Sequence, residues 1–286
     1  MTRSTLLHLR IPFSFFLMPI FLFGLAISDS MEVARIVIVF VSLHLFLYPA
    51  SNGFNSYFDK DEKSIGGLRN PPKVQNDLYW TSMVFDFFAL CLGLLIDWKY
   101  AIMLLIYGLV SKAYSHPSIR IKSKPVLGWL TVGVFQGYFT LLMTVYGVLD
   151  MPLEAIFNWK YQVPAILSSA LLLGSYPMTQ IYQHEEDDSR GDITLSLKLG
   201  IKGTFLFTGV FFMLSNMGFL YFLLNIYSED DAIMFQLALT PVVVFFLYWF
   251  WKSFKNADHV NFKNAMRLNF ISSFMLSAFF IYLVVS

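Results

Sequence analysis

Residues 11–28 read IPFSFFLMPIFLFGLAIS, an apolar stretch without a charged side chain. A run of about 17–25 such residues is long enough to cross a bilayer as an α-helix. The basic start, MTRSTLLHLR, resembles the charged region of a signal peptide. No small-x-small cleavage pattern follows it, so we interpret 11–28 as a retained first span.

Eight further apolar stretches of similar length follow, at 34–52, 78–97, 99–116, 125–148, 163–183, 203–226, 232–251 and 267–285. They are continuous rather than alternating, which favours helices over the strands of a membrane barrel. We therefore predict an all-α membrane protein of about nine transmembrane helices. We expect one polytopic domain over residues 1–286.

The composition supports this class and excludes others. Of 286 residues, 57% are hydrophobic and only 14% are charged, which is far from the balance of a water-soluble protein. The formal net charge of +1 gives no general attraction to nucleic acid. Cys91 is the only cysteine, which excludes a disulfide framework and a cysteine metal cluster.

Basic residues divide unevenly between the two sides of this arrangement. With the N-terminus in the cytoplasm, only Arg35, Lys99 and Lys160 of the 20 lysines and arginines fall on the opposite side. Lysine and arginine concentrate in cytoplasmic loops of membrane proteins. We therefore expect a multi-pass protein of a bacterial inner membrane whose N-terminus and long polar loops are cytoplasmic.

The first polar cluster follows the second span and reads NGFNSYFDKDEKSIGGLRNPPK, from Asn52 to Lys73. Helical spacing of three or four residues places one stripe of polar side chains on the preceding span: His44, Tyr48, Asn52, Asn55 and Asp59. A polar stripe on a membrane helix faces the bundle interior or water. Its lower end offers oxygen ligands one turn apart, and Asp61 and Glu62 follow at once.

The second cluster follows the sixth span and reads YPMTQIYQHEEDDSRGDITL, from Tyr176 to Leu195. Here Ser175, Thr179, Gln183 and Asp187 form a stripe with a spacing of four residues, and more carboxylates crowd its end. Carboxylates this dense repel one another unless cations lie among them. Hard oxygen ligands without a histidine or cysteine pattern favour Mg²⁺, which commonly binds one or two carboxylates together with substrate phosphates.

A third cluster, KAYSHPSIRIKSK from Lys112 to Lys124, is basic and lies on the same side. Arg120, Lys122 and Lys124 alternate, so an extended loop would point them in one direction. Such groups bind phosphate oxygens well. Two acidic helix ends and a basic loop beside an aromatic interior indicate a Mg²⁺-bridged diphosphate attached to a lipidic chain, because aromatic faces also attract a carbocation.

These residues resemble the UbiA superfamily of intramembrane prenyltransferases. The family motif N-x-x-x-D-x-x-x-D is represented by Asn55 and Asp59, with Lys63 in place of the third acid. The motif D-x-x-x-D-x-x-x-G-x-x-T-L is represented by Asp187 and by Gly191 through Leu195, with Gln183 in place of its first acid. YSHPSIRIKSK is most similar to the loop of the chlorophyll and tocopherol branch, and NFKNAMRLNF resembles the entry to the family's last helix.

The resemblance implies a UbiA-like bundle around a central cavity and a set of site residues. The implied catalytic residues are Asn55, Asp59 and Asp187. The implied metal ligands are Asn55, Asp59, Asp61, Gln183, Glu186 and Asp187. The implied substrate-binding residues are Arg120, Lys122, Lys124, Tyr114, Lys112 and Arg69. Whether Asp61 or Glu62, and Glu185 or Glu186, replace the missing acids stays open at this stage.

The function so implied is Mg²⁺-dependent transfer of an isoprenyl group from a prenyl diphosphate to a small hydrophobic, aromatic or cyclic acceptor within the membrane. The altered acids keep a terpene cyclase of the same family open. A transporter ranks last, because no inverted repeat stands out.

Several polar residues within the spans have plainer interpretations. We interpret His44 as a hydrogen-bonded interior residue rather than a ligand. Asp86, in the third span, is equally compatible with a functional role and with a bond to a neighbouring helix. Gln136, Thr140 and Thr144 share a face of the fifth span, and helix packing is the favoured explanation.

Overall fold

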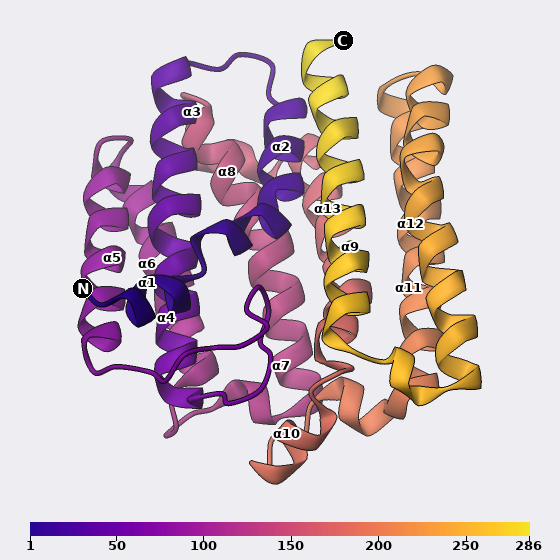
Figure 1. The fold of residues 1–286 in the computed structure, drawn as a ribbon. Coiled ribbons are helices and arrows are strands. Elements are labelled where there is room, and N and C mark those ends of the chain that lie inside the picture. Colours follow the sequence, from indigo (N-terminus) through magenta and orange to yellow (C-terminus); the bar gives the residue numbers. More distant parts are fainter.

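The computed structural model describes residues 1–286 and is helical throughout its membrane-spanning part (Figure 1). Three of its long rods are built from consecutive segments: α1 (Arg3–Leu9), η1 (Ile11–Leu17) and α2 (Met18–Ala26); α3 (Val33–Phe40), η2 (Val41–Leu47) and α4 (Tyr48–Asp59); α7 (Pro125–Val132), η4 (Gly133–Phe139) and α8 (Thr140–Val148). The other long helices are α5 (Asp77–Leu94), α6 (Trp98–Ser115), α9 (Trp159–Gln180), α11 (Leu195–Ile226), α12 (Glu229–Lys255) and α13 (Phe262–Val285). The short connecting helices are η3 (Ile121–Ser123), η5 (Leu153–Phe157), α10 (His184–Ser189) and η6 (Ala257–His259).

The predicted all-α membrane fold is confirmed. Seven of the rods are long and apolar enough to cross a membrane. The other two, α6 and α9, occupy the remaining predicted stretches but contain more polar residues. The main difference lies in the first stretch, where the chain bends at Arg10, which has a left-handed φ of 47°, and continues as the 3₁₀ segment η1.

The rods form a closed ring in chain order. Each packs against the next rod in the sequence, and α13 returns to pack against α2. The last residue lies at the end of the ring opposite α10 (Figure 1). At that far end α2 also packs against α8, which closes the centre of the ring.

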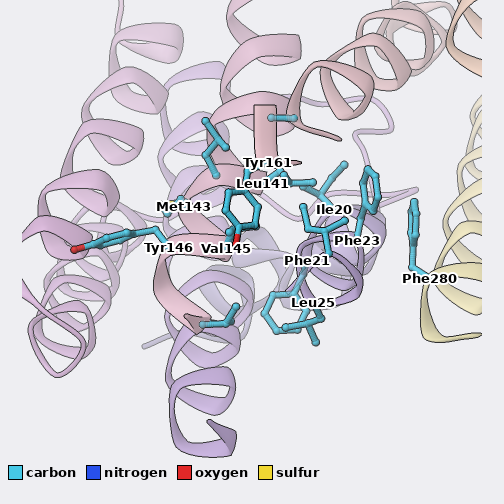
Figure 2. Packing of buried hydrophobic residues seen from close by; sticks show 14 of the residues in the cluster. Ile20, Phe21, Phe23, Leu25, Leu141, Met143, Val145, Tyr146, Tyr161 and Phe280 are labelled. Atoms are coloured by element: carbon cyan, nitrogen blue, oxygen red, sulfur yellow. The ribbon is translucent and has the colours of Figure 1, made fainter. Parts of the chain in front are cut away.

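Aromatic and aliphatic side chains fill the closed end (Figure 2). The rings of Phe23 in α2 and Phe280 in α13 stack with centroids 4.5 Å apart. Gly24 allows α2 to approach α8 closely, because a Cβ atom there would lie 2.8 Å from the Thr144 Cγ2 atom. The end near α10 is hollow, and the polar clusters predicted from the sequence are found there.

Two spans contain π-helical segments, η2 before Tyr48 and η4 around Gln136. A π segment inserts an extra residue into a helix and rotates the side chains that follow it relative to those before it. The two segments therefore change which side chains of these spans face the centre of the ring.

Candidate active site

A cavity of about 750 Å³ occupies the hollow end of the ring. This volume is typical of a small-molecule site. Apart from Arg10, its charged lining residues all come from the three polar segments predicted from the sequence, which lie at its mouth: Asp59, Asp61, Lys122, Asp187, Arg190 and Asp192. The deeper wall is made of uncharged side chains, many of them apolar.

The first motif lies at the last turn of α4. The Asn55 side-chain amide donates to an Asp59 carboxylate oxygen (2.8 Å) and to the Ser115 hydroxyl (3.0 Å). The helix ends directly after Asp59, where Lys60 adopts the left-handed conformation. The predicted pair Asn55 and Asp59 is therefore held as one unit at the cavity wall.

The basic loop supplies the counter-charges for this unit. The Lys122 ammonium lies 2.5 Å from Asp59 Oδ1, and a terminal nitrogen of Arg120 lies 3.8 Å from the same atom. The Arg120 guanidinium also donates two 2.7 Å hydrogen bonds to the carboxylate of Asp192. This bidentate bond raises the pKa of Arg120, so the guanidinium stays charged.

Asp192 was not predicted as a site residue, although it is 2% exposed and lines the cavity. It directly follows Gly191, whose φ of 72° allows the chain to turn there. An acid inside the GDITL stretch was the only available signal, because no family motif position falls on it.

The second motif places Asp187 at the same mouth. Thr194, the N-cap of α11, donates from its hydroxyl to the Asp187 carboxylate (3.2 Å). Burial raises the pKa of Asp187 to about 7, and the negative charges of Asp192 and Asp61 act in the same direction. The Thr194 bond and the Lys122 charge oppose that rise without cancelling it. Unlike Asp59 and Asp192, Asp187 forms no ion pair with the basic loop.

Arg190 joins the acids that flank the two motifs. It forms ion pairs with Asp61 and with Glu186, the latter at 2.6 Å. The second carboxylate oxygen of Glu186 is buried without a hydrogen-bond partner. Glu185, by contrast, lies outside and pairs with Lys63 at 2.9 Å across two exposed side chains. Of the two predicted substitutes in the second motif, only Glu186 is buried beside the mouth.

The remaining predicted residues divide into two sets. Gln183 lines the cavity and donates to the Ser64 carbonyl (3.2 Å), and the Tyr114 hydroxyl meets that of Tyr176 at the cavity wall. Lys112, Lys124 and Arg69 are not among the lining residues.

The membrane-embedded charges of α5 and α6 pair with each other. The Lys112 ammonium forms an ion pair with Asp86, which resolves the open interpretation of Asp86 in favour of a bond to a neighbouring helix. His44 is interior as predicted and stacks on Phe40 at 4.8 Å, but its ring nitrogens have no hydrogen-bond partners.

Arg10 is a second site residue that sequence reasoning missed. Its guanidinium is buried, donates to the carbonyls of Gly66 (3.0 Å) and Asn52 (3.2 Å), and lies over the Phe13 ring. From the sequence, Arg10 was counted only among the basic residues on the cytoplasmic side, which set the topology. Its position ties the loop after α4 to the mouth of the cavity.

The donor set fits a hard divalent cation. The side chains of Asp59, Asp61, Gln183 and Asp187 line the mouth, and Glu186 lies beside it, paired with Arg190. No three histidine, cysteine or acidic side chains are close enough together to enclose a metal ion by themselves. An ion there would complete its shell with ligand oxygens, as Mg²⁺ commonly does with phosphates.

The sequence matches the model of the UbiA prenyltransferase family over residues 16–274. No curated protein matches the sequence. Among solved structures, a UbiA homolog from Archaeoglobus fulgidus bound to GPP and Mg²⁺ has a TM-score of 0.68 at 16% identity, covering 99% of this chain and 100% of that one.

Two further structures are similar over nearly the whole chain. The apo UbiA homolog from Aeropyrum pernix K1 has a TM-score of 0.75 at 14% identity and covers 95% of this chain and 98% of that one. A structure from work on the biosynthesis of digeranylgeranylglyceryl phosphate synthase in membranes has a TM-score of 0.61 at 19% identity. It covers 99% of this chain and 97% of that one.

Proposed function

Because this chain belongs to the UbiA prenyltransferase family, we propose that it transfers an isoprenyl group from a prenyl diphosphate to a small hydrophobic acceptor within the membrane. The observation that carries the proposal is the pairing of Arg120 and Lys122 with both Asp59, at the end of α4, and Asp192, shortly before α11, beside a cavity that Lys122 and both acids line. The ligands of the Archaeoglobus homolog, GPP and Mg²⁺, support it. Residues 1–286 are taken as one catalytic domain.

The acids of the two motifs and two cations of the basic loop have distinct roles in this proposal. Asp59 and Asp187 would hold Mg²⁺, with Asn55, Asp61, Gln183 and Glu186 as supporting oxygen ligands. When bound, the ion supplies positive charge to the diphosphate oxygens. Arg120 and Lys122 stabilise the same charge as it develops on the leaving diphosphate, because they are already in position.

The reaction follows from this arrangement. The bond between the allylic carbon and the diphosphate oxygen breaks, and its electron pair stays on the diphosphate. A nucleophilic carbon of the acceptor forms the new bond to the allylic carbon, and a base takes the surplus proton. The apolar part of the cavity keeps water away from the cation, which would otherwise be hydrolysed.

The orientation proposed for the chain places the mouth at the cytoplasmic face of a bacterial inner membrane. The uneven distribution of lysine and arginine supports it. The helix α10, which contains Asp187, and the last residue lie at opposite ends of the ring (Figure 1), so the C-terminus would lie on the other side of the membrane.

The test uses the purified full chain in detergent, with Mg²⁺ and geranyl, farnesyl or geranylgeranyl diphosphate, with and without a membrane lipid extract as the acceptor source. We expect diphosphate release and a prenylated lipid only when the extract is present. Asp59→Ala should lower the rate at least about a hundredfold, since it removes transition-state charge stabilisation.

The matched control is Asp188→Ala. Asp188 is the exposed residue next to Asp187 in the sequence, and it does not line the cavity. A terpene hydrocarbon or alcohol formed without the extract would replace the transferase proposal with a cyclase. Unchanged turnover by Asp59→Ala would contradict both the transferase and the cyclase proposals.

A further inference from the structure

Lysines and aromatic rings gather on the outer surface of α11 and α12, at the end of the ring that contains α10 (Figure 1). The Lys202 ammonium lies 4.4 Å from the centroid of the Phe254 ring, a contact that joins the two helices. The Lys255 and Lys252 ammonium groups lie 3.9 and 5.4 Å from the centroid of the Trp251 ring. We call this set the basic–aromatic patch; its members are Lys202, Tyr248, Trp251, Lys252, Phe254 and Lys255.

The three lysines of the patch have no acidic partner. None of them forms an ion pair, whereas Arg120, Lys122 and Arg190 at the mouth are all paired with carboxylates. Asp258 is the only acid of residues 195–286 at this end of the ring, because the others begin α12 at the far end. Asp258 also forms no ion pair, so no carboxylate of the protein neutralises the patch.

Two general effects account for part of this arrangement. Lysines concentrate on the cytoplasmic side of a membrane protein, and lysines in the last turn of a helix interact favourably with its dipole. Lys202 lies at the other kind of helix end. Gly200, with a φ of 66°, interrupts α11, so Lys202 lies in the first turn of the helix that follows. A cation is unfavourable there, and its position beside Phe254 therefore requires a different explanation.

An apolar stripe leads away from the patch toward the membrane interior. Leu206, Val210, Leu214 and Met217 follow Lys202 at a spacing of three or four residues, and their side chains are 51–60% exposed. Met217 lies about 22 Å from Lys202 along the helix, which exceeds the depth of one leaflet, half of a hydrocarbon core of about 30 Å. The acyl chains of a lipid can therefore lie along this stripe with the headgroup beside the lysines.

The surroundings of the patch favour a phospholipid over the prenyl diphosphate. No member of the patch lines the cavity, and the patch contains no carboxylate that could hold Mg²⁺ beside a diphosphate. Tyr248 and Trp251 are 54% and 52% exposed. Tyrosine and tryptophan on the surface of a membrane protein typically lie at the level of the lipid headgroups. The ammonium groups over these rings are therefore at the depth of the phosphates.

We propose that the basic–aromatic patch binds the headgroup of an anionic glycerophospholipid from the surrounding leaflet. Lys202, Lys252 and Lys255 contact the phosphate oxygens, and the aromatic rings position the ammonium groups through cation–π contacts. Clusters of lysine at the membrane surface attract anionic lipids. This lipid site lies outside the proposed active site and does not depend on the proposed prenyl transfer.

The test uses Trp251 as the reporter. The full chain is reconstituted in phosphatidylcholine vesicles with a minor fraction of brominated phosphatidylglycerol or brominated phosphatidylcholine, because bromine quenches nearby tryptophan fluorescence. We expect stronger quenching by phosphatidylglycerol, and Trp251→Phe should remove this difference. Lys202→Gln combined with Lys252→Gln and Lys255→Gln should lower the relative affinity for phosphatidylglycerol about fivefold for each lysine removed. The corresponding triple substitution by arginine should retain it, since arginine also binds phosphate.

Arg3→Gln combined with Lys73→Gln and Lys124→Gln is the matched control. These three residues are exposed, form no ion pair and lie in segments predicted to be cytoplasmic, so the control removes the same charge elsewhere on that side. Equal quenching by the two lipids in the wild type, or equal losses in the patch and control variants, would overturn the site. Displacement of phosphatidylglycerol by an equal amount of geranylgeranyl diphosphate would also reject the phospholipid assignment, and would assign the patch to the prenyl donor.

Discussion

The ammonium group of Lys122 lies 2.5 Å from a carboxylate oxygen of Asp59 and 3.7 Å from one of Asp192. A single lysine of the basic loop thus neutralises acids from two distant segments, Asp59 at the end of α4 and Asp192 shortly before α11. The side chains of Asp59 and Asp192 are 4% and 3% exposed, so solvent screens these interactions little. The Lys122 ammonium is therefore already held in place where we propose that the diphosphate binds.

Lys122→Met should destabilise the ligand-free protein and greatly reduce turnover. Removing one partner of a buried ion pair commonly costs about 3 kcal/mol, because the remaining charge is left uncompensated. Mg²⁺ should stabilise this variant more than the wild type, since the ion can replace the ammonium beside Asp59. Thermal unfolding with EDTA or Mg²⁺ measures both effects. Lys124→Met, in the same loop but outside the cavity lining, is the control, and equal behaviour of the two variants would contradict the assignment.

Asp192→Asn should lower the rate of diphosphate release at least about tenfold, although no motif position predicted Asp192. The substitution weakens the bidentate bond that orients Arg120. Arg120→Lys should have a similar effect, because an ammonium cannot donate the same pair of bonds. Steady-state kinetics with geranyl diphosphate and the membrane extract measure the change. Asp188→Asn serves as the control, and a wild-type rate for Asp192→Asn would show that Arg120 needs no such support.

Glu185 and Glu186, the two candidates for the acid that is missing at Gln183, should differ in their effect on Mg²⁺ binding and turnover. Glu186→Gln removes a buried charge paired with Arg190, so we expect weaker Mg²⁺ binding and slower turnover. Glu185→Gln removes only an exposed partner of Lys63, and exposed ion pairs contribute little. Mg²⁺ titration of the donor-dependent rate separates the two variants. Similar Mg²⁺ dependence for both would reject Glu186 as a ligand.

Lys112 and Asp86 should act in stability rather than in donor binding, contrary to the role inferred for Lys112 from the sequence. Their side chains are 19% and 16% exposed, so either single substitution, Lys112→Met or Asp86→Asn, leaves an uncompensated charge and should cost about 3 kcal/mol. The double variant should recover much of that loss. Thermal unfolding tests the recovery, and KM for the prenyl diphosphate should stay at the wild-type value. A raised KM without a loss of stability in Lys112→Met would show that Lys112 contributes to donor binding.

Gly137→Ala should prevent proper packing of η4 against α9, because the added Cβ atom meets the Ser169 backbone, which cannot move aside as a flexible side chain would. We expect a lower melting temperature. Gly209→Ala is the control, since its Cβ atom would lie 3.7 Å from the nearest neighbour, an ordinary contact. A wild-type melting temperature for Gly137→Ala would show that the close approach is not required.

The sequence by itself determined the class of the protein and the positions of its spans. The stretch 125–148 coincides with the rod Pro125–Val148, and the others agree to within several residues. Hydropathy is a local property, and the bilayer requires each spanning segment to satisfy its own backbone, so residue order suffices for this level of structure. Asn55 and Asp59 were likewise recognisable, because one helical turn brings them together.

Only the tertiary structure decided how distant charges pair. Arg10, Arg190 and Asp192 become site residues through contacts with segments far along the chain, and no local spacing encodes those contacts. The same holds for Lys112, which turns from the cavity to Asp86. The π segment around Gln136 is a further case, because the extra residue is accommodated only where α9 supplies Ser169 to bond the η4 backbone. Periodicity assumes a regular helix, so it could not predict which side of that span faces the cavity.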